Sequence, residues 1–299
     1  MRVAAIDVGT NSVLLTVAER QADGLAPALE RAEITRLGRG VDASGRLSDD
    51  GIARTLEVLR DYAADARRLG AERIACVATS AARDAANGAS FLEQVRALGL
   101  EPQIIGGERE AQLSFLAARR DFGRADEPLA VLDVGGGSTE ITYGRGAPEF
   151  RTSLDVGSVR LFERLVRQDP PSHEERLAVR AAIDAALSSV PEPPRGAELV
   201  GVAGTLTTLA TLVLGLPAYD AARVHGARLS LHQVSAWANR LWALPLAERR
   251  ALPGLQPLRA DVIPVGVLLV EAVLYRLRFP EVTVSDRGVR WGLLYELAG

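Results

Sequence analysis

The sequence predicts an α/β fold in which one plan of strands and helices occurs twice. Its 299 residues suggest two domains. Two segments, residues 3–12 and 129–140, each contain an apolar run, then Asp-x-Gly, then small and hydroxyl residues. Each opens a similar succession of strands and helices, so the chain is interpreted as a duplication at domain scale. We expect an N-terminal domain at residues 1–125 and a C-terminal domain at 126–299, with the last helix packing back on the first.

The first half predicts a strand meander followed by alternating helices and strands. Ser48 precedes Asp49 and Asp50, which is a favourable helix start, and Gly70 ends that helix. Apolar residues then recur at helical or strand spacing. The predicted strands are residues 2–7, 13–18, 28–37, 73–78 and 103–105, and the predicted helices are 49–69, 90–98 and 108–119.

The second half repeats this plan after a polar stretch with Gly and Pro, residues 121–128, which predicts the domain junction. Ser172 with Glu175, and Ser230 with Gln233, mark two helix starts. The predicted strands are residues 129–133, 140–143, 150–155, 199–203 and 282–284, and the predicted helices are 172–190, 204–214, a helix from 230, 261–277 and 288–297. The cleft between two such halves is the expected ligand site.

Composition excludes several classes of protein. The formal net charge is −3, so phosphate binding must be local, and neither nucleic acid nor membrane is an expected partner. The sequence contains no lysine, which excludes a P-loop lysine and a lysine nucleophile. Cys76 lies in an apolar run and predicts a buried, inert thiol, in keeping with a cytoplasmic location. The three histidines lack zinc-ligand spacing.

Targeting and membrane segments are not expected. The first apolar run meets an acid too soon for a signal peptide. The longest apolar stretch, residues 262–275, contains Pro264 and Glu271 and is too short to span a bilayer. We expect Glu271 to be paired or at an interface.

The two Asp-x-Gly segments predict phosphate loops. An aspartate at a strand end can hold a cation, glycines let backbone N–H groups approach phosphate oxygens, and hydroxyls add donors. A lone Asp-x-Gly is commonly only a hairpin turn. Three consecutive glycines, however, cost backbone entropy that a plain hairpin does not require. Two such loops facing each other would hold a polyphosphate chain. The candidate residues are Asp7, Gly9, Thr10, Asn11 and Ser12 in the first loop and Asp133, Gly135, Gly136, Gly137, Ser138, Thr139 and Glu140 in the second.

Together with further motifs, these loops resemble the exopolyphosphatase and guanosine pentaphosphate phosphohydrolase (Ppx/GppA) family. The similarity covers essentially the whole chain, in order. The matching segments are AIDVGTNS at residues 5–12, ATSAARDA at 78–85, GEREA at 107–111, DVGGGSTE at 133–140, GVAGT at 201–205 and SDRGVRWG at 285–292.

The resemblance implies two ribonuclease-H-like domains of the actin-like, sugar kinase and Hsp70 superfamily around a cleft. It also implies attack of water on a terminal phosphoanhydride, dependent on Mg²⁺ or Mn²⁺. Glu110 matches the family's catalytic glutamate and Arg83 a substrate-phosphate arginine. Asp133 and Glu140 match the metal-associated acids, with Asp7 on the facing loop.

Some residues depart from the family pattern or have simpler interpretations. Arg109 stands where many members have a second glutamate, and Gly106 where a serine is common. Without the resemblance, Glu110 fits an acid in the first turn of a helix and Arg83 a solvated arginine. Gly204 and Thr205 fit a strand-to-helix turn, or phosphate or nucleotide binding at a helix N-terminus.

We therefore expect an exopolyphosphatase. Longer members carry an additional C-terminal helical region, and this chain ends at Gly299, so short polyphosphate chains are the expected substrate. Hydrolysis of guanosine pentaphosphate is the alternative within the same reaction class. More distant alternatives are an ATP-dependent kinase, which would need an aspartate base, and an actin-like filament or nucleotide sensor. A homodimer is left open.

Overall fold

The computed structural model describes residues 1–22, 24–124 and 127–299. Contacts divide it into two units, which we describe separately: unit 1 is Met1–Ala117 with Val289–Gly299, and unit 2 is Ala118–Gly288. The predicted boundary between residues 125 and 126 falls outside the described residues. By their contacts, the two units divide between Ala117 and Ala118, within the helix Gly107–Phe122.

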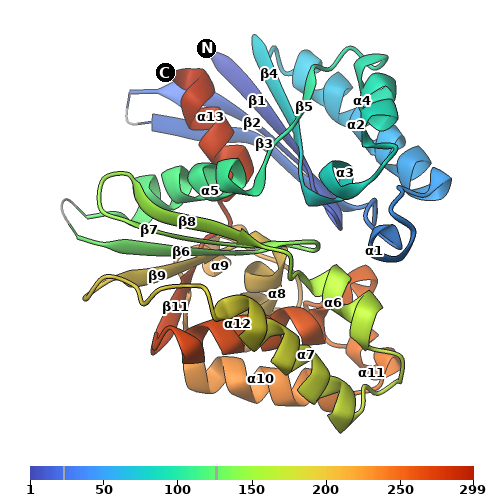
Figure 1. Ribbon diagram of the computed structural model, residues 1–299. Coiled ribbons are helices and arrows are strands. Elements are labelled where there is room, and N and C mark those ends of the chain that lie inside the picture. The colour runs from blue at the N-terminus through green and yellow to red at the C-terminus, as the bar shows by residue number, and fades with distance from the viewer. Residues whose placement is uncertain (23, 125–126) are drawn as a thin grey trace. The chain divides into compact units, whose positions relative to one another are not determined.

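Unit 1 is built on a five-stranded sheet in the order β3-β2-β1-β4-β5 (Figure 1). β1 (Arg2–Val8), β2 (Ser12–Gln21) and β3 (Gly24–Ile34) form an antiparallel meander. β4 (Arg73–Ala78) and β5 (Pro102–Ile104) join it parallel to β1. A meander with parallel additions is the plan that the sequence predicts, and it fits the ribonuclease-H-like domain that the resemblance implies. The carboxyl ends of β1, β4 and β5 consequently lie at one edge of the sheet.

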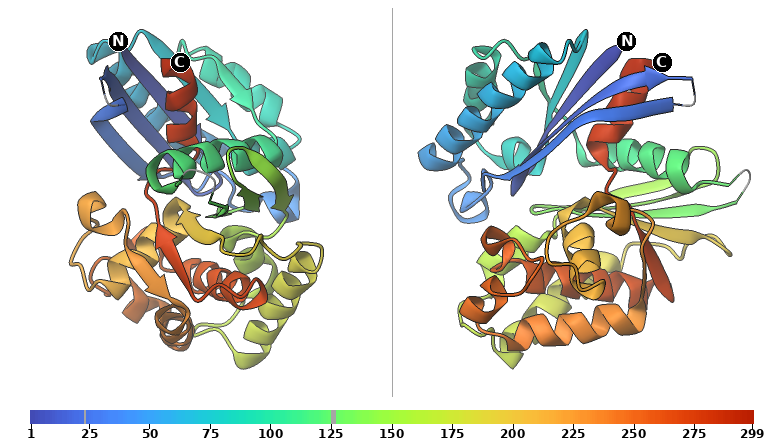
Figure 2. Two further views of the ribbon diagram at one scale, coloured as in Figure 1. Left: turned by 90° about the vertical axis from the view of Figure 1, so that its left-hand side faces the viewer. Right: turned by 180° about the vertical axis from the view of Figure 1, so that it is seen from behind.

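Helices cover both faces of this sheet, because successive residues of β1 are apolar and point to opposite faces. Ala4 and Ile6 pack with α2 (Asp49–Arg68) and α4 (Gly88–Arg96), whereas Val3 and Ala5 pack with α5 (Gly107–Phe122) and α13 (Val289–Ala298). Gly292 of α13 packs so closely on α5 that a Cβ there would lie 2.3 Å from the Leu113 carbonyl oxygen. The last helix thus packs on the first sheet, and the two termini lie close together (Figure 2).

Unit 2 repeats the sheet with one additional strand, in the order β10-β11-β9-β6-β7-β8. The meander is β6 (Leu129–Val134), β7 (Thr139–Gly144) and β8 (Pro148–Leu154). β9 (Glu198–Val202) and β11 (Glu281–Val284) run parallel to β6, and β10 (Arg228–Ser230) is antiparallel to β11. The fold class predicted from the duplicated pattern is confirmed.

The core of unit 2 lies between this sheet and a set of helices around α12 (Ile263–Arg276). α6 (Ser158–Leu165), α7 (His173–Leu187), α8 (Ala203–Val213) and α10 (Leu231–Ala243) all contact α12 (Figure 1). Glu271 of α12 pairs with Arg176 and Arg180 of α7 at 3.9 and 3.8 Å, so the expectation that it is paired is confirmed.

Most predicted elements are present, and the differences concern short or irregular segments. Both capping boxes, at Ser172 and Ser230, are formed. The predicted helix end at Arg119 is wrong, because α5 continues through Asp121 to Phe122. Several short elements were not expected from the sequence: α1 (Val41–Ser44), α3 (Ser80–Asp84), α6, α9 (Ala221–Val224), β10, α11 (Leu246–Arg250) and the 3₁₀ helix η1 (Pro257–Arg259).

Cys76 is a buried free thiol, as predicted. Burial, with a smaller contribution from the charge of Asp7, raises its pKa to about 12.

No helix in the described part of the chain combines the length and the hydropathy needed to cross a bilayer.

Candidate active site

The turn between β1 and β2 in unit 1 contains the first predicted phosphate loop. Asp7 pairs in register with Leu14, two positions from the turn. The turn closes where the Gly9 N–H donates to the Ser12 carbonyl at 2.9 Å. A Cβ on Gly9 would lie 3.1 Å from that same oxygen, so glycine suits this close approach.

The carbonyl groups of this loop are held by the segment that follows β3. The Thr10 carbonyl accepts from the Gly38 N–H at 2.8 Å, and the Asn11 carbonyl accepts from Thr35 and Arg36 at 3.1 and 3.0 Å. The side-chain nitrogen of Asn11 is buried and has no acceptor among the described residues. Buried donors of this kind usually have a partner, so this amide is available to a ligand.

The turn between β6 and β7 in unit 2 has the same construction. Asp133 pairs in register with Glu140, and the Gly135 N–H donates to the Ser138 carbonyl at 3.0 Å. Asp133 is therefore equivalent to Asp7, but its cross-strand partner is an acid where unit 1 has a leucine. Both acids are buried, at 7% and 2% exposure, and Ser153 donates to Glu140 Oε1 at 2.7 Å.

The glycine run is held by the start of α6. The Gly136 carbonyl accepts from Val159 and Arg160 at 2.9 and 3.1 Å, and the Gly137 carbonyl accepts from Arg160 Nε at 2.7 Å. A Cβ on Gly157 would lie 2.4 Å from the Gly136 oxygen, so glycine is required there. In both loops, therefore, neighbouring segments engage the carbonyl groups.

Thr139 differs from the other predicted loop donors. Its side chain is fully buried, and its hydroxyl donates to the Val156 carbonyl at 2.6 Å. This hydroxyl is committed to the protein, so its predicted part in substrate binding is limited to shaping the loop.

Arg83 and Glu110 meet at the sheet edge that contains the first loop. Arg83 lies in α3 after β4, and Glu110 lies in the first turn of α5 after β5. The NH1 group of Arg83 donates to Glu110 Oε1 at 2.9 Å and to the Ile105 carbonyl at 3.1 Å. Glu110 is 6% exposed. Both residues are site residues predicted from the family resemblance, but their pairing was not predicted.

Gly204 and Thr205 lie where β9 passes into α8. Thr205 is buried, and its hydroxyl donates to the Val134 carbonyl at 3.3 Å, which links this turn to the second loop. Ala203 has a φ of 73°, a left-handed conformation that non-glycine residues rarely adopt. Strain of this kind is concentrated at functional sites.

Comparison with known proteins identifies the family. The sequence matches the Ppx/GppA phosphatase family over residues 16–299. It is 41% identical to Exopolyphosphatase 2 of Mycobacterium tuberculosis over 100% of this chain and 99% of the relative. The chain belongs to the Ppx/GppA phosphatase family. The Aquifex aeolicus family member is 36% identical, with a TM-score of 0.85, over 100% of this chain and 97% of that one. An exopolyphosphatase from Cytophaga hutchinsonii is 25% identical, with a TM-score of 0.91, over 99% and 97%.

Asp133 and Glu140 are the residues of this Ppx/GppA chain that could hold a metal. Two buried carboxylates in register on adjacent strands are oxygen donors of the kind that Mg²⁺ and Mn²⁺ prefer. Within the described chain, no cluster of three or more His, Cys, Asp or Glu side chains is arranged to hold a metal ion. Two carboxylates still fit Mg²⁺, because substrate phosphates and water commonly complete its coordination.

Arg109, where many Ppx/GppA members have a glutamate, has a structural partner in unit 1. Its guanidinium forms an ion pair with Glu296 of α13 and donates to Gln112 at 3.0 Å. It therefore ties α13 to α5 on the exposed side of the helix that contains Glu110.

Two arginines that were not predicted as site residues contact the second loop and the turn at Gly204. Arg160 donates to the Gly137 carbonyl, and the guanidinium of Arg259 lies against Gly204, where a Cβ would be 2.2 Å from NH1. Burial lowers the pKa of Arg259 to about 10, so it is still cationic at neutral pH. Arg259 belongs to η1, far along the chain from Gly204, and no local motif marks it.

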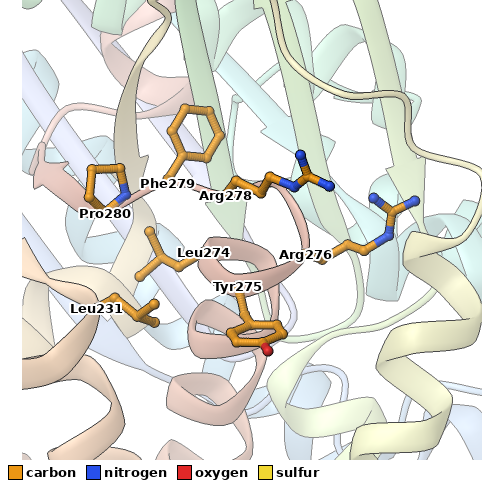
Figure 3. A pocket seen from close by; sticks show the side chains of 7 residues that line it. All are labelled: Leu231, Leu274, Tyr275, Arg276, Arg278, Phe279 and Pro280. Carbon is orange, nitrogen blue, oxygen red and sulfur yellow. The ribbon is translucent and has the colours of Figure 1, made fainter.

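Unit 2 also has a pocket of about 630 Å³ that lies away from the glycine loop (Figure 3). It is lined by Leu231, Leu274, Tyr275, Arg276, Arg278, Phe279 and Pro280. Pro280 precedes β11, whereas the glycine loop follows the carboxyl end of β6, to which β9 and β11 run parallel. The pocket therefore lies at the opposite end of this sheet from the glycine loop.

Proposed function

We propose that this chain is an exopolyphosphatase, which hydrolyses the terminal phosphate from inorganic polyphosphate. The relatives named exopolyphosphatase support this substrate, and one geometric observation carries the chemistry: the buried Glu110 carboxylate lies beside the Arg83 guanidinium. Hydrolysis of a phosphoanhydride needs a group that orients or deprotonates water and positive charge that meets the phosphate. This pair supplies both groups.

Each loop is suited to bind phosphate oxygens. Thr10, Asn11 and Ser12 in unit 1, and Gly136, Gly137 and Ser138 in unit 2, contribute backbone N–H groups and polar side chains. Gly9 and Gly135 shape the binding loops, because their N–H groups close the two turns. The engagement of the loop carbonyls by neighbouring segments supports this role, because carbonyl oxygens would repel phosphate. Gly204, with Thr205 behind it, adds a binding position at the N-terminus of α8.

The reaction follows from these groups. Glu110 accepts a proton from a water molecule as the water oxygen forms a bond to the terminal phosphorus. The bond from phosphorus to the bridging oxygen breaks, and the shortened chain leaves with the electron pair of that bond. Arg83 stabilises the negative charge on the terminal phosphate oxygens, as a guanidinium suits this geometry. Glu110 then returns its proton to solvent.

Asp133 and Glu140 in unit 2 would hold Mg²⁺ or Mn²⁺, and Asp7, at the equivalent position in unit 1, is the third acid that we propose for metal binding. The metal ion, when bound, would neutralise charge on the phosphate oxygens. The protein's own contribution is to keep two carboxylates buried and in register, so that they favour a cation.

We further propose that the enzyme acts in the cytoplasm and as a homodimer. Its one cysteine is a buried thiol, which suits a reducing compartment. Sedimentation equilibrium tests the second proposal against the chain mass of 31.9 kDa.

The function is tested by incubating purified protein and Mg²⁺ separately with polyphosphate, guanosine pentaphosphate, and ATP plus a sugar. We expect orthophosphate release from polyphosphate at the highest kcat/KM. Faster release from guanosine pentaphosphate would move the assignment to the nucleotide. Sugar phosphorylation without phosphate release would overturn the hydrolase assignment.

A further inference from the structure

The ion pair of Arg83 with Glu110 joins the two residues that the proposed chemistry needs separately. The NH1–Oε1 distance is 2.9 Å, and NH1 also donates to the Ile105 carbonyl. On its other side, Nε of Arg83 lies 3.6 Å from Asp84 Oδ1. One cation therefore lies between two carboxylates in unit 1.

The two partners differ in exposure. The Arg83 side chain is 26% exposed and the Glu110 side chain 8%. An anion arriving from solvent therefore meets the guanidinium before it meets the carboxylate. A carboxylate paired with a guanidinium is also a weaker base than a free one, because the cation favours its charged form.

We propose that Arg83 holds Glu110 in a masked state until the terminal phosphate binds and draws the guanidinium away. This inference rests on the proposed function and adds a regulatory step to the same site. The phosphate offers two or more anionic oxygens in bidentate geometry, which competes well with one carboxylate oxygen. Once Arg83 has moved, the proton affinity of Glu110 rises and it becomes competent to accept a proton from water. The base is thus activated only when substrate is present.

Other charged groups surround this pair. Asp84 lies beside Nε of Arg83, and Ser80 donates to the other oxygen of Asp84 at 3.2 Å. On α5, Arg109 is held by Glu296 of α13, and Glu108 lies exposed in the same first turn. These groups are unchanged in the variants below, except in the Glu108 control.

The first test measures binding of tripolyphosphate by calorimetry with divalent metal removed. Glu110→Gln should bind about tenfold more tightly than the parent, because binding no longer has to break the ion pair. Glu108→Gln removes the same charge from the same helical turn and should change binding less than threefold. In an Arg83→Ala background, the effect of Glu110→Gln should fall to that of Glu108→Gln.

The second test compares pH profiles for polyphosphate hydrolysis. The acidic limb of kcat/KM reports the free enzyme, and that of kcat reports the substrate complex. Arg83→Ala should move the acidic limb of kcat/KM to higher pH and leave that of kcat near its place, because the bound parent enzyme has already lost the pair. Arg83→Lys should give an intermediate shift.

The outcomes separate this proposal from the proposed function. The masking proposal would be overturned if Arg83→Ala shifted the acidic limbs of kcat/KM and kcat equally. It would also be overturned if Glu110→Gln and Glu108→Gln tightened tripolyphosphate binding equally. Either result would show that Arg83 stays on Glu110 throughout. A parent protein that binds and hydrolyses no polyphosphate would overturn the proposed function itself.

Discussion

Arg287 donates a hydrogen bond of 2.8 Å to Asp121, and both residues lie beside the places where the chain passes between the units. Asp121 follows the passage at Ala118, and Arg287 precedes the return at Val289. Both belong to unit 2, where His225 also lies 3.9 Å from Asp121 and 2.8 Å from Asp286. The bond therefore links the segment that follows the first passage between the units to the segment that precedes the second.

Removing this bond should destabilise the protein most at neutral pH. Arg287→Gln leaves Asp121, whose side chain is 10% exposed, without its closest cation. We expect a loss of about 2–4 kcal/mol in the free energy of unfolding, somewhat below the roughly 3–5 kcal/mol for breaking a fully buried pair, because the Arg287 side chain is 28% exposed. Urea denaturation at pH 7 measures it.

The pH dependence follows from Asp121. Burial, more than any other cause, raises the pKa of this carboxyl above its unfolded value of about 3.9. A group with a raised pKa contributes stability that is present below the unfolded pKa and is lost as pH rises through the folded pKa. Removing Arg287 raises that pKa further, so the defect of Arg287→Gln should shrink as pH falls from 7 towards 4.

A control of the same residue type is Arg228→Gln. Its partner is Glu281 at 3.1 Å, and both side chains are about half exposed, at 57% and 44%. It should cost less than about 1 kcal/mol at either pH. A defect as large as that of Arg287→Gln would show that Asp121 is not the cause.

Glu110→Gln should reduce kcat for polyphosphate hydrolysis about 10²–10⁴-fold, the usual contribution of a general base. Glutamine keeps the shape of the side chain but cannot accept the proton. Glu108 lies two residues before Glu110 in the same helical turn and is exposed, so Glu108→Gln should retain turnover within a few-fold of the parent. Near-parental turnover of a folded Glu110→Gln enzyme would contradict the catalytic assignment.

Metal dependence should follow the carboxylate pair of unit 2. Asp133→Asn should raise the Mg²⁺ concentration needed for half-maximal activity and lower the maximal rate. Ser153→Ala, which removes the 2.7 Å hydrogen bond to Glu140, should raise that concentration about tenfold while preserving most of the rate at saturating metal. Full activity of the parent in excess chelator would rule out the metal.

The features that could be predicted from the sequence are those with local causes. Ser172 and Ser230 cap helices through contacts three residues away, and both starts are found as predicted. The two Asp-x-Gly turns form hairpins of the same register, since the turn fixes which residues pair. The duplicated sheet order follows from these two meanders.

The remaining features depend on contacts between distant parts of the chain. The pairing of Arg83 with Glu110 joins residues 27 apart, and Arg259 reaches Gly204 from a separate segment. Short helices such as α3 and α6 have too few residues for a periodic pattern. Asp121 looked like part of a polar linker, but its burial with Arg287 extends α5 beyond the predicted end.

Gly157→Ala should impair the glycine loop of unit 2 more than it impairs folding. The added Cβ would lie within 2.4–2.6 Å of backbone atoms of Gly136 and Gly137, which cannot move independently of the loop. We expect KM for polyphosphate to rise at least about tenfold, since a displacement of about 1 Å in a positioning group can cost 10²-fold. Gly146→Ala is the matched control, because a Cβ there meets nothing within 4 Å. It should leave KM and thermal stability unchanged. If Gly157→Ala lowered the melting temperature sharply but left KM at the parental value, the start of α6 would support the fold and not the phosphate loop.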